Sequence, residues 1–301
     1  MRLNKFDPSV AKFISENDLS KLQNSSFIKS LFNKLNFFGH ETYSLLVLSQ
    51  LLANCFRNNP VRKESYSCLQ NFESYLHECL TNMNGQEMVS VKSELFIKDF
   101  NENQNKFNQE ISKKIKGVDS LKNIFGFGLG EGFFEQELIL KEGDIKNEIS
   151  ISGFDPYASK MNTQVRYLNN SREFDGICDL FLCRWSLHHV SPSKRWQILG
   201  GFLSKLRKGT RVLIIEEGVF IPFHEQSFSE KIYTLLLCLS DYFFNSIMRN
   251  EWGQSTDFYI SHLVEEDFVE IENFFSLPFK KEVKQIQDFS FHQTLVTYDL
   301  G

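Results

Sequence analysis

The chain lacks an excess of basic residues. Its 33 lysines and arginines are outnumbered by 38 aspartates and glutamates, and the formal net charge is −5 at pH 7. A surface that binds nucleic acid needs clustered positive charge to neutralise phosphates. The composition therefore argues against a nucleic-acid platform, and we expect no nucleic acid among the partners.

Long hydrophobic runs and paired cysteines are also missing. The two longest apolar stretches, residues 43–56 and 232–248, are shorter than the roughly 20 residues that a membrane-spanning helix needs, and the second contains Asp241. The 6 cysteines show no CxxC or zinc-finger spacing, and the first residues contain no apolar segment of the kind that a secretory signal needs. We expect a cytoplasmic protein with reduced thiols and no membrane span.

The sequence does contain enough apolar residues, 42%, to bury a large core. In its first part, residues 40–58 and 65–83 place apolar side chains at intervals of three and four, and Asp, Asn and Ser stand where helices would begin. This pattern predicts a helical N-terminal domain over residues 1–117. That domain could serve as a lid, as the interface of a homodimer or as a partner-binding module.

From residue 118 onwards, short apolar or β-branched runs alternate with helix-like stretches. Strands are expected at residues 123–127, 148–155, 164–168, 178–185 and 210–218. Residues 262–298 predict a helix followed by a final strand pair. Such alternation predicts a parallel sheet with crossover helices, and hence an α/β domain over residues 118–301. The charged, amide-rich residues 98–117 before it form either a solvated helix or a connector.

Four of the chain's 16 glycines stand at alternate positions in residues 125–138, FGFGLGEGFFEQEL. They lie between an expected strand and a helix-like run. There, free N–H groups at a helix N-terminus and the freedom of glycine allow an anionic ligand group to approach the backbone closely. The dinucleotide spacing GxGxxG does not fit, because counting from Gly126 or Gly128 puts Glu131 or Phe133 in the sixth position. The spacing that fits is GxGxG.

This GxGxG, formed by Gly128, Gly130 and Gly132, resembles motif I of the class I S-adenosylmethionine-dependent methyltransferases. Residues 178–220 resemble the fourth strand, the next helix and the fifth strand of small-molecule members. An acid opens that strand, LHH follows it, and the helix leads through a KG turn into VLIIE. The resemblance covers about residues 118–300. It implies a Rossmann-like, doubly wound, mostly parallel seven-stranded sheet, S-adenosyl-L-methionine as cofactor, and methyltransferase activity.

An acid stands where such a sheet would hold a ribose. Asp155 closes the second expected strand, roughly 20 residues after Gly132, the spacing at which a strand-end carboxylate binds ribose hydroxyls. The alternative is that Asp155, followed by Pro156, only caps the next helix. Within the resemblance, Asp155 is the ribose acid and the three motif glycines lie under the methionine part of the cofactor.

The resemblance also assigns residues at the end of the fourth strand. Arg184 and Trp185 resemble the Lys-Trp pair of the dimeric O-methyltransferases and would lie against the cofactor. One family feature is missing, because Gly126 replaces the acid that usually stands two residues before the first motif glycine. The methionine amino group therefore lacks its common partner, and Glu131 is the candidate substitute. The candidates for the adenine edge are Asn169 and Asn170.

Two histidines, His188 and His189, lie just past the fourth expected strand, at the edge where open α/β sheets bind ligands. Histidine is the side chain most easily poised as a base near neutral pH. The resemblance places His188 at the catalytic histidine of the O-methyltransferases. Glu216 and Glu217, which close the fifth strand, could orient such a base or face solvent. The alternative for either histidine is packing, with its ring N–H bonded to a backbone carbonyl.

A metal site is a competing interpretation of the same region. The potential ligands are His188, His189, His224 and His262, with Glu216 or Glu217. A family of small-RNA 2′-O-methyltransferases uses Glu and His ligands in comparable regions. Its ExxEH motif would align on Trp185 and the two adjacent histidines, so both of its glutamates are missing. We therefore expect no metal.

The segment between the fifth and sixth expected strands, residues 221–268, contains an apolar helical stretch rich in aromatic side chains. In the family this position often covers the substrate, and ordinary core packing is the alternative. The pattern as a whole favours a methyltransferase that acts on a hydroxyl or amine of a small molecule by in-line transfer, with His188 as the base. The alternatives are a protein side chain as acceptor, or a catalytically idle member of the fold whose helical half binds a partner.

Overall fold

The computed structural model describes part of the chain: residues 3–16, 109–118, 121–130, 149–155, 164–217, 221–226, 234, 238, 259–261, 263–288 and 291–301. The chain divides into two units. The first combines Met1–Asn105, Gly218–His262 and Gln287–His292, and the second combines Lys106–Glu217, Leu263–Ile286 and Gln293–Gly301. Most of the expected helical domain, and with it the expected dimer interface, lies outside the described residues and stays a prediction.

In the first unit, helix α1 (Pro8–Glu16) begins at a proline. Proline suits the first helical position because its missing N–H would have no helical partner there. Asp7 accepts a hydrogen bond from the backbone N–H of Ser9 (2.9 Å), which caps the helix. Val10 and Ile14, one helical turn apart, are fully buried and fix the face that packs inward.

Residues distant in sequence complete this unit. Before α1 lies the short 3-10 helix η1 (Leu3–Lys5), and Phe6 then forms a parallel β-bridge with Ile260. The ring of Phe13 meets that of Phe223 edge-on, with centroids 5.7 Å apart. The start of the chain therefore packs with parts of the segment that follows the fifth strand. None of the helices in the described ranges is long and apolar enough to cross a bilayer.

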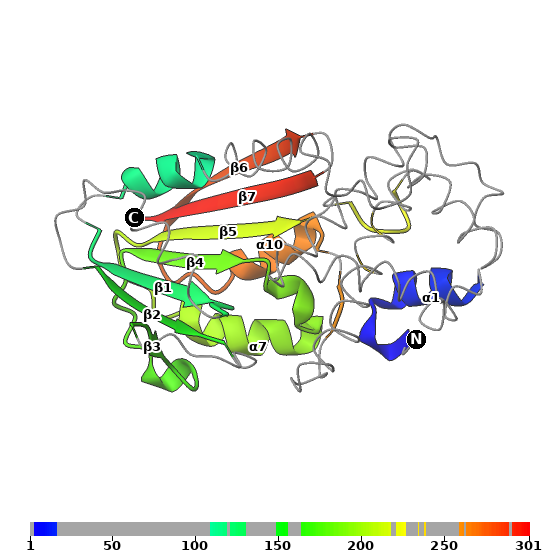
Figure 1. Ribbon diagram of the computed structural model, residues 1–301, viewed down its shortest axis with the longest axis horizontal. Helices are drawn as coiled ribbons and strands as arrows, with labels where there is room; N and C mark the ends of the chain where they lie inside the picture. Colours follow the sequence, from blue (N-terminus) through cyan, green and yellow to red (C-terminus); the bar gives the residue numbers. More distant parts are fainter. Residues whose placement is uncertain are drawn as a thin grey trace, which may run out of the picture. The chain divides into compact units, whose positions relative to one another are not determined.

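The second unit is built on a seven-stranded sheet with the order β3-β2-β1-β4-β5-β7-β6 (Figure 1). The strands are β1 (Asn123–Phe127), β2 (Ser150–Phe154), β3 (Arg166–Tyr167), β4 (Leu180–Arg184), β5 (Arg211–Glu217), β6 (Phe279–Asp288) and β7 (Phe291–Leu300). β1 to β5 pair in parallel, and β7 runs antiparallel to β5. Helices described in this unit include α7 (Pro192–Leu203) and α10 (Glu265–Glu272), and residues 109–116 are also helical. The expected mostly parallel seven-stranded sheet is confirmed.

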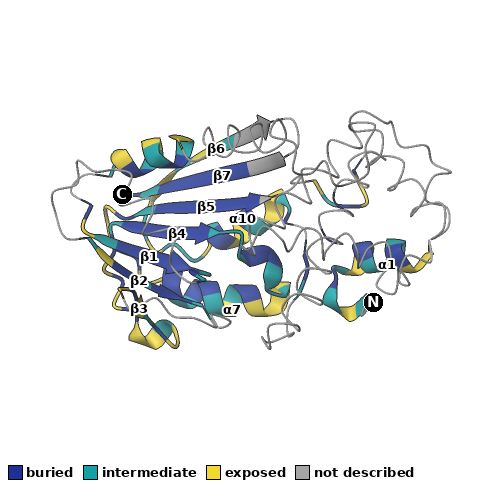
Figure 2. Cartoon of the chain, in the orientation of Figure 1, coloured by how far each residue is buried: buried dark blue, intermediate teal, exposed yellow. Residues whose placement is uncertain are grey.

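The central strands read as continuous apolar runs because both of their faces are covered (Figure 2). On one face, Leu182 and Ile215 belong to a buried cluster with Ile111, which lies in the helical residues 109–116. On the other face, Phe125 stacks on Phe181 and lies 5.2 Å from Phe202 of α7. Helices on both faces make the sheet a doubly wound one.

The direction in which the chain adds strands to the sheet reverses at β1. The chain runs outward from β1 to β2 and β3, then returns to form β4 on the other side of β1. Open α/β sheets bind ligands beside the carboxyl ends of their strands at such a switch point. Here those ends are Phe127 and Arg184, so the residues that follow them are the first place to look for a site.

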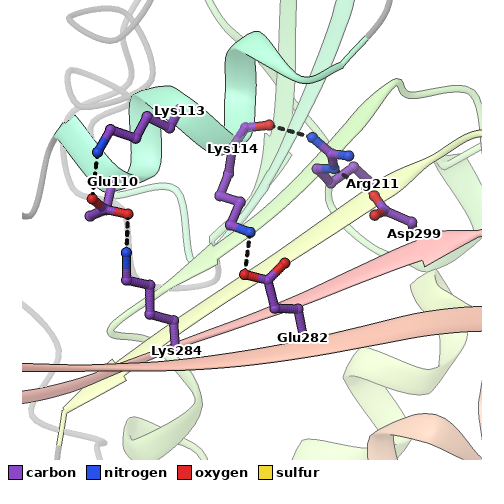
Figure 3. Close-up of polar contacts among 7 residues, drawn as sticks. All are labelled: Glu110, Lys113, Lys114, Arg211, Glu282, Lys284 and Asp299. Atoms are coloured by element: carbon purple, nitrogen blue, oxygen red, sulfur yellow. Dashed lines mark hydrogen bonds and ion pairs between the residues drawn. The ribbon is translucent and has the colours of Figure 1, made fainter.

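A cluster of charged side chains attaches the helical residues 109–116 to strands β5 and β6 of the sheet (Figure 3). Glu110 pairs with both Lys113 (2.7 Å) and Lys284 of β6. Lys114 pairs with Glu282 of β6 (2.6 Å). The Arg211 guanidinium of β5 also donates to the Lys114 backbone carbonyl (2.6 Å). The cluster therefore attaches the helical residues 109–116, which precede β1 in the chain, to β5 and β6.

This cluster predicts acid-sensitive stability. Hydrogen bonds from Lys113 and Lys284 lower the pKa of Glu110 from 4.5 to about 2. A lowered pKa in the folded state stabilises the protein above about pH 4.5, and the contribution is lost as the pH falls toward 2. We expect Glu110→Gln to reduce the free energy of unfolding by on the order of 1 kcal/mol at pH 7, because the pairs are partly exposed. The difference from wild type should shrink steadily below pH 4.5 in urea unfolding.

The control is Glu270→Gln, which removes an exposed carboxylate of α10 outside the cluster and beyond the first turn, where an acid stabilises a helix. It should follow the wild-type urea midpoint at every pH. A Glu110→Gln difference that stays constant between pH 7 and pH 3 would contradict the ionic role of Glu110.

Candidate cofactor and catalytic site

The loop after β1 contains two glycines with left-handed backbone. Gly128 has a φ of 69° and Gly130 a φ of 56°, a region that residues with a Cβ rarely adopt. A Cβ on Gly128 would lie 1.9 Å from Ser186 Oγ, whereas one on Gly130 would meet no atom of the described residues within 4 Å. Gly128 is therefore required by a close approach as well as by its conformation. Glu131 and Gly132, also expected in this loop, lie outside the described residues.

Asp155, directly after β2, faces this loop. Its Oδ2 accepts a hydrogen bond from the backbone N–H of Gly130 (2.7 Å). On the other side of the same residue, the hydroxyl of Tyr167 donates to the Gly130 carbonyl (3.0 Å). The structure thus brings together the loop and the acid that the sequence singled out, and it adds Tyr167 from the end of β3.

At the end of β4, Arg184 and Trp185 form a stacked pair, with the guanidinium carbon 4.2 Å from the indole centroid. Trp185 has a φ of 47° and is the single non-glycine residue with positive φ in the described ranges. Such a conformation costs about 1–3 kcal/mol and persists when the surroundings enforce it. Here the indole packs against the buried cluster that contains Ile215, and Trp185 N donates to the Ile215 carbonyl (2.8 Å). Contact of this pair with a cofactor stays a prediction.

A buried carboxylate organises the turn that follows. Glu216 of β5 is 0% exposed. Its Oε1 accepts hydrogen bonds from the backbone N–H groups of Ser186 (3.0 Å) and Leu187 (2.8 Å), and its Oε2 lies 2.6 Å from Nδ1 of His188. A carboxylate oxygen facing the ring calls for a hydrogen on the Nδ1 of His188, and in the neutral ring this arrangement leaves the lone pair on Nε2. Of the two glutamates that close β5, Glu216 is the one whose side chain is seen to meet the histidine.

His189 lies beside His188 in the 3-10 turn η7 (Leu187–His189), with ring centroids 4.0 Å apart. His224 belongs to the first unit, and His262 lies outside the described residues. Within the described part of the chain, no three His, Cys, Asp or Glu side chains form a group that could hold a metal ion.

Arg195 of α7 supports the histidine turn and is only 1% exposed. Its guanidinium donates to the backbone carbonyl of Val190 (3.1 Å) and pairs with Asp267 of α10 (3.1 Å). Asp267 also accepts from the backbone N–H of Val264 (2.8 Å), just before α10 begins. This ion pair joins the end of the turn to α7 and α10.

The candidates for the adenine edge lie directly after β3. Asn169 donates to the carboxylate of Glu173 through its side-chain amide and its backbone N–H (3.1 Å each), and these bonds lower the pKa of Glu173. The Asn170 side chain accepts from the backbone N–H of Arg172 (2.9 Å) and caps a short 3-10 helix. Contact of either asparagine with an adenine stays a prediction.

No family model and no curated protein sequence matches the chain. Solved structures of methyltransferases align with part of the chain. An O-methyltransferase family protein from Burkholderia thailandensis aligns with a TM-score of 0.43 at 9% identity, over 69% of this chain and 61% of that one. Magnesium protoporphyrin IX methyltransferase from Synechocystis PCC 6803, solved with bound SAH, aligns with a TM-score of 0.42 at 12% identity, over 68% and 86%. A SAM-dependent methyltransferase from Archaeoglobus fulgidus gives 0.44 at 10%, over 64% and 93%.

This chain spans less than two thirds of the length of the Burkholderia protein. At these identities and scores, function has to be inferred from the residues of the site itself.

The sequence analysis missed three residues of the site. Ser186 reaches the glycine loop across 58 positions, and Arg195 meets Asp267 across 72. Neither spacing follows from a local pattern. Tyr167 could have been noticed, because a tyrosine that closes a short strand beside a glycine loop places its hydroxyl near that loop.

Proposed function

We propose that the protein is an S-adenosylmethionine-dependent methyltransferase that acts on a hydroxyl or amine of a small molecule. The observation that carries the proposal is the hydrogen bond from Gly130 to Asp155, which joins a GxGxG loop to a strand-end acid beside the switch point. The pair of His188 and Glu216 stands at the carboxyl ends of the neighbouring strands β4 and β5. A nucleoside-binding corner and a base therefore share one edge of the sheet.

The residues present fit this cofactor. Among the described atoms, none from elsewhere in the chain lies within 4 Å of the point where a Cβ on Gly130 would stand, so the loop leaves room above its backbone. Asp155 supplies a carboxylate next to that point, suited to ribose hydroxyls. When bound, S-adenosylmethionine supplies a methyl group on a positively charged sulfur.

His188 is the group that would handle the acceptor's proton. Its Nε2 can accept a hydrogen from a hydroxyl or an ammonium, while Glu216 holds the ring orientation and stabilises the positive charge that forms on it. The hydrogen bonds from Ser186 and Leu187 keep the Glu216 carboxylate fixed in its buried position. Positioning of the acceptor in line with the transferred methyl group is the remaining requirement.

The first test is calorimetry with S-adenosylhomocysteine. We expect micromolar binding to the wild type. Asp155→Asn should weaken it roughly tenfold or more, because charge-assisted hydrogen bonds to the ribose are worth about 1.5–3 kcal/mol each. Asp155→Ala should weaken it further, since it also removes the acceptor for Gly130 N.

The matched control is Asp179→Asn. Asp179 also accepts backbone hydrogen bonds with its side chain, from Lys122 and Asn123 (2.8 Å each), but it does so at the opposite end of β1 from the loop that Asp155 meets. This variant should lose stability without losing affinity. A flat titration of well-folded wild-type protein would instead favour the catalytically idle alternative. Mass spectrometry of cell extract incubated with labelled cofactor would identify the acceptor and separate a small molecule from a protein side chain.

A further inference from the structure

The residue between the two left-handed glycines, Leu129, anchors the glycine loop to the sheet. Its side chain is buried in a small apolar cluster with Ile151 of β2 and Val165, which directly precedes β3. The ring of Tyr167, two residues further along, packs against the same cluster. The loop after β1 therefore lies against β2 and β3.

A glycine in β2 provides the space for Leu129. A Cβ on Gly153 would lie 2.8 Å from Cδ2 of Leu129 and 2.5 Å from the carbonyl oxygen of Gly126. In the parallel pairing of β2 with β3, Gly153 stands beside Tyr167, and alternate residues such as Ile151 share its face of the sheet. Leu129 therefore occupies the place of a missing side chain, next to Tyr167.

From this position the Tyr167 hydroxyl reaches the residue that follows Leu129. It donates to the carbonyl of Gly130 (3.0 Å), while the N–H of Gly130 donates to Oδ2 of Asp155 (2.7 Å). The N–H and the C=O of one residue belong to two consecutive peptide planes, which meet at its Cα. Side chains from the ends of β2 and β3 therefore hold both planes, and with them the φ and ψ angles of Gly130.

Gly130 is the kind of residue at which such a restraint matters. Its φ of 56° lies in one of several regions that glycine adopts with similar ease, so its conformation is not fixed by the residue type. A ligand that needs one conformation of a loop binds more tightly when that conformation is already held before binding.

We propose that Tyr167 is a positioning residue of the cofactor site and that it acts through Gly130. The inference rests on the proposed function, in which the glycine loop lies under the methionine part of the cofactor and Asp155 binds the ribose. By holding the Gly130 carbonyl, the hydroxyl keeps the loop in the conformation in which Gly130 N–H also meets Asp155. The short edge strand β3 (Figure 1) contributes to cofactor affinity in this way.

The first experiment is calorimetry of Tyr167→Phe with S-adenosylhomocysteine. The substitution keeps the ring that packs on the Leu129 cluster and removes only the hydroxyl. We expect the affinity to fall roughly three- to tenfold, the effect of one hydrogen bond between uncharged groups.

Tyr298→Phe is the matched control. The Tyr298 hydroxyl donates to Oε1 of Glu272 (3.3 Å), and its strand, β7, lies toward the other edge of the sheet. The control loses a tyrosine hydroxyl as well, and it should keep the wild-type affinity. Thermal unfolding of both variants shows that the fold is kept.

The second experiment observes the contact itself, without ligand. The dipeptide Gly-Glu occurs once in the chain, at residues 130–131, so ¹³C-carbonyl glycine combined with ¹⁵N glutamate labels a single peptide bond. Tyr167→Phe should move the carbonyl resonance of Gly130, because the carbonyl loses a hydrogen bond, and Tyr298→Phe should leave it in place. A role of Tyr167 in packing alone would not produce this difference.

The assignment is overturned if Tyr167→Phe binds S-adenosylhomocysteine as tightly as the wild type, if both variants lose the same affinity, or if the Gly130 resonance does not move. Wild-type protein that binds no S-adenosylhomocysteine overturns the proposed function, and the cofactor role of Tyr167 with it. Tight binding by the wild type together with an unaffected Tyr167→Phe overturns the assignment alone.

Discussion

Glu216→Gln is expected to lower methyl transfer about 10²–10⁴-fold while the fold and the affinity for S-adenosylhomocysteine are kept. The single oxygen of glutamine can take the place of Oε1 and accept from Ser186 N and Leu187 N. Its NH₂ group then faces Nδ1 of His188, which has to become an acceptor. The ring hydrogen of His188 then moves to Nε2, and Nε2 can no longer accept a proton from the methyl acceptor.

The measurement is the rate of S-adenosylhomocysteine formation with the acceptor found by mass spectrometry. Nitrogen chemical shifts of His188 in NMR report the change of tautomer directly, which a purely structural role of Glu216 would not produce. Glu282→Gln on β6 removes a carboxylate that pairs with Lys114 at the other side of the sheet, and it should retain wild-type turnover. His188→Ala alone should be as slow as the double variant His188→Ala/Glu216→Gln, because each of the two substitutions disables the same base, His188.

Normal turnover by Glu216→Gln would show that His188 is not the base. A loss of turnover that is matched by a loss of cofactor affinity would lead to the same conclusion, because the defect would then lie in binding.

Gly128→Ala has the largest effect that we expect on stability and binding together. Alanine at a φ of 69° is strained, and its Cβ would lie 1.9 Å from Oγ and 2.3 Å from Cβ of Ser186. Rotation can move the hydroxyl but not the Ser186 Cβ, so the β1 and β4 loops have to move apart. We expect a loss of about 2–5 kcal/mol in the free energy of unfolding and no measurable binding of S-adenosylhomocysteine.

Substitutions at two other glycines distinguish the cost of backbone strain from the cost of the steric clash with Ser186. Gly130→Ala and Gly209→Ala also place alanine at a positive φ, but within the described part of the chain neither Cβ would meet an atom within 4 Å. Each should cost about 1–2 kcal/mol, and Gly209→Ala, in the turn before β5, should keep its ligand affinity. Ser186→Gly added to Gly128→Ala should recover part of the lost stability. Equal stability of the Gly128 and Gly130 variants would mean that the two loops do not touch.

The strands that build the site were predictable because they are buried on both faces. A run such as residues 180–184 is apolar at nearly every position, which few other elements tolerate. The expected strands at residues 123–127 and 210–218 correspond to β1 and β5, and the expected final helix and strand pair to α10, β6 and β7. The glycine loop and Asp155 were predictable for a related reason, since turn glycines and strand-end acids have a local signature.

Contacts between loops had no such signature. The sequence offered Glu216 and Glu217 on equal terms, because alternation along a strand separates two faces without saying which one meets the histidine. The approach of Ser186 to Gly128 depends on the lateral alignment of β1 and β4, and on the left-handed turn at Trp185. Those are properties of the assembled sheet.

Every hydrogen bond seen to hold the Glu216 carboxylate crosses from β5 to the turn after β4. A local separation of β4 and β5 would break the contact between Glu216 and His188, so that the histidine ring would no longer be held in position, while the rest of the fold stayed intact. Fraying of an outer strand such as β3 would leave those bonds untouched. The catalytic rate would thus report on the pairing of β4 and β5. It would fall when these two strands separate locally, a change too small to alter a spectroscopic signal averaged over the whole chain.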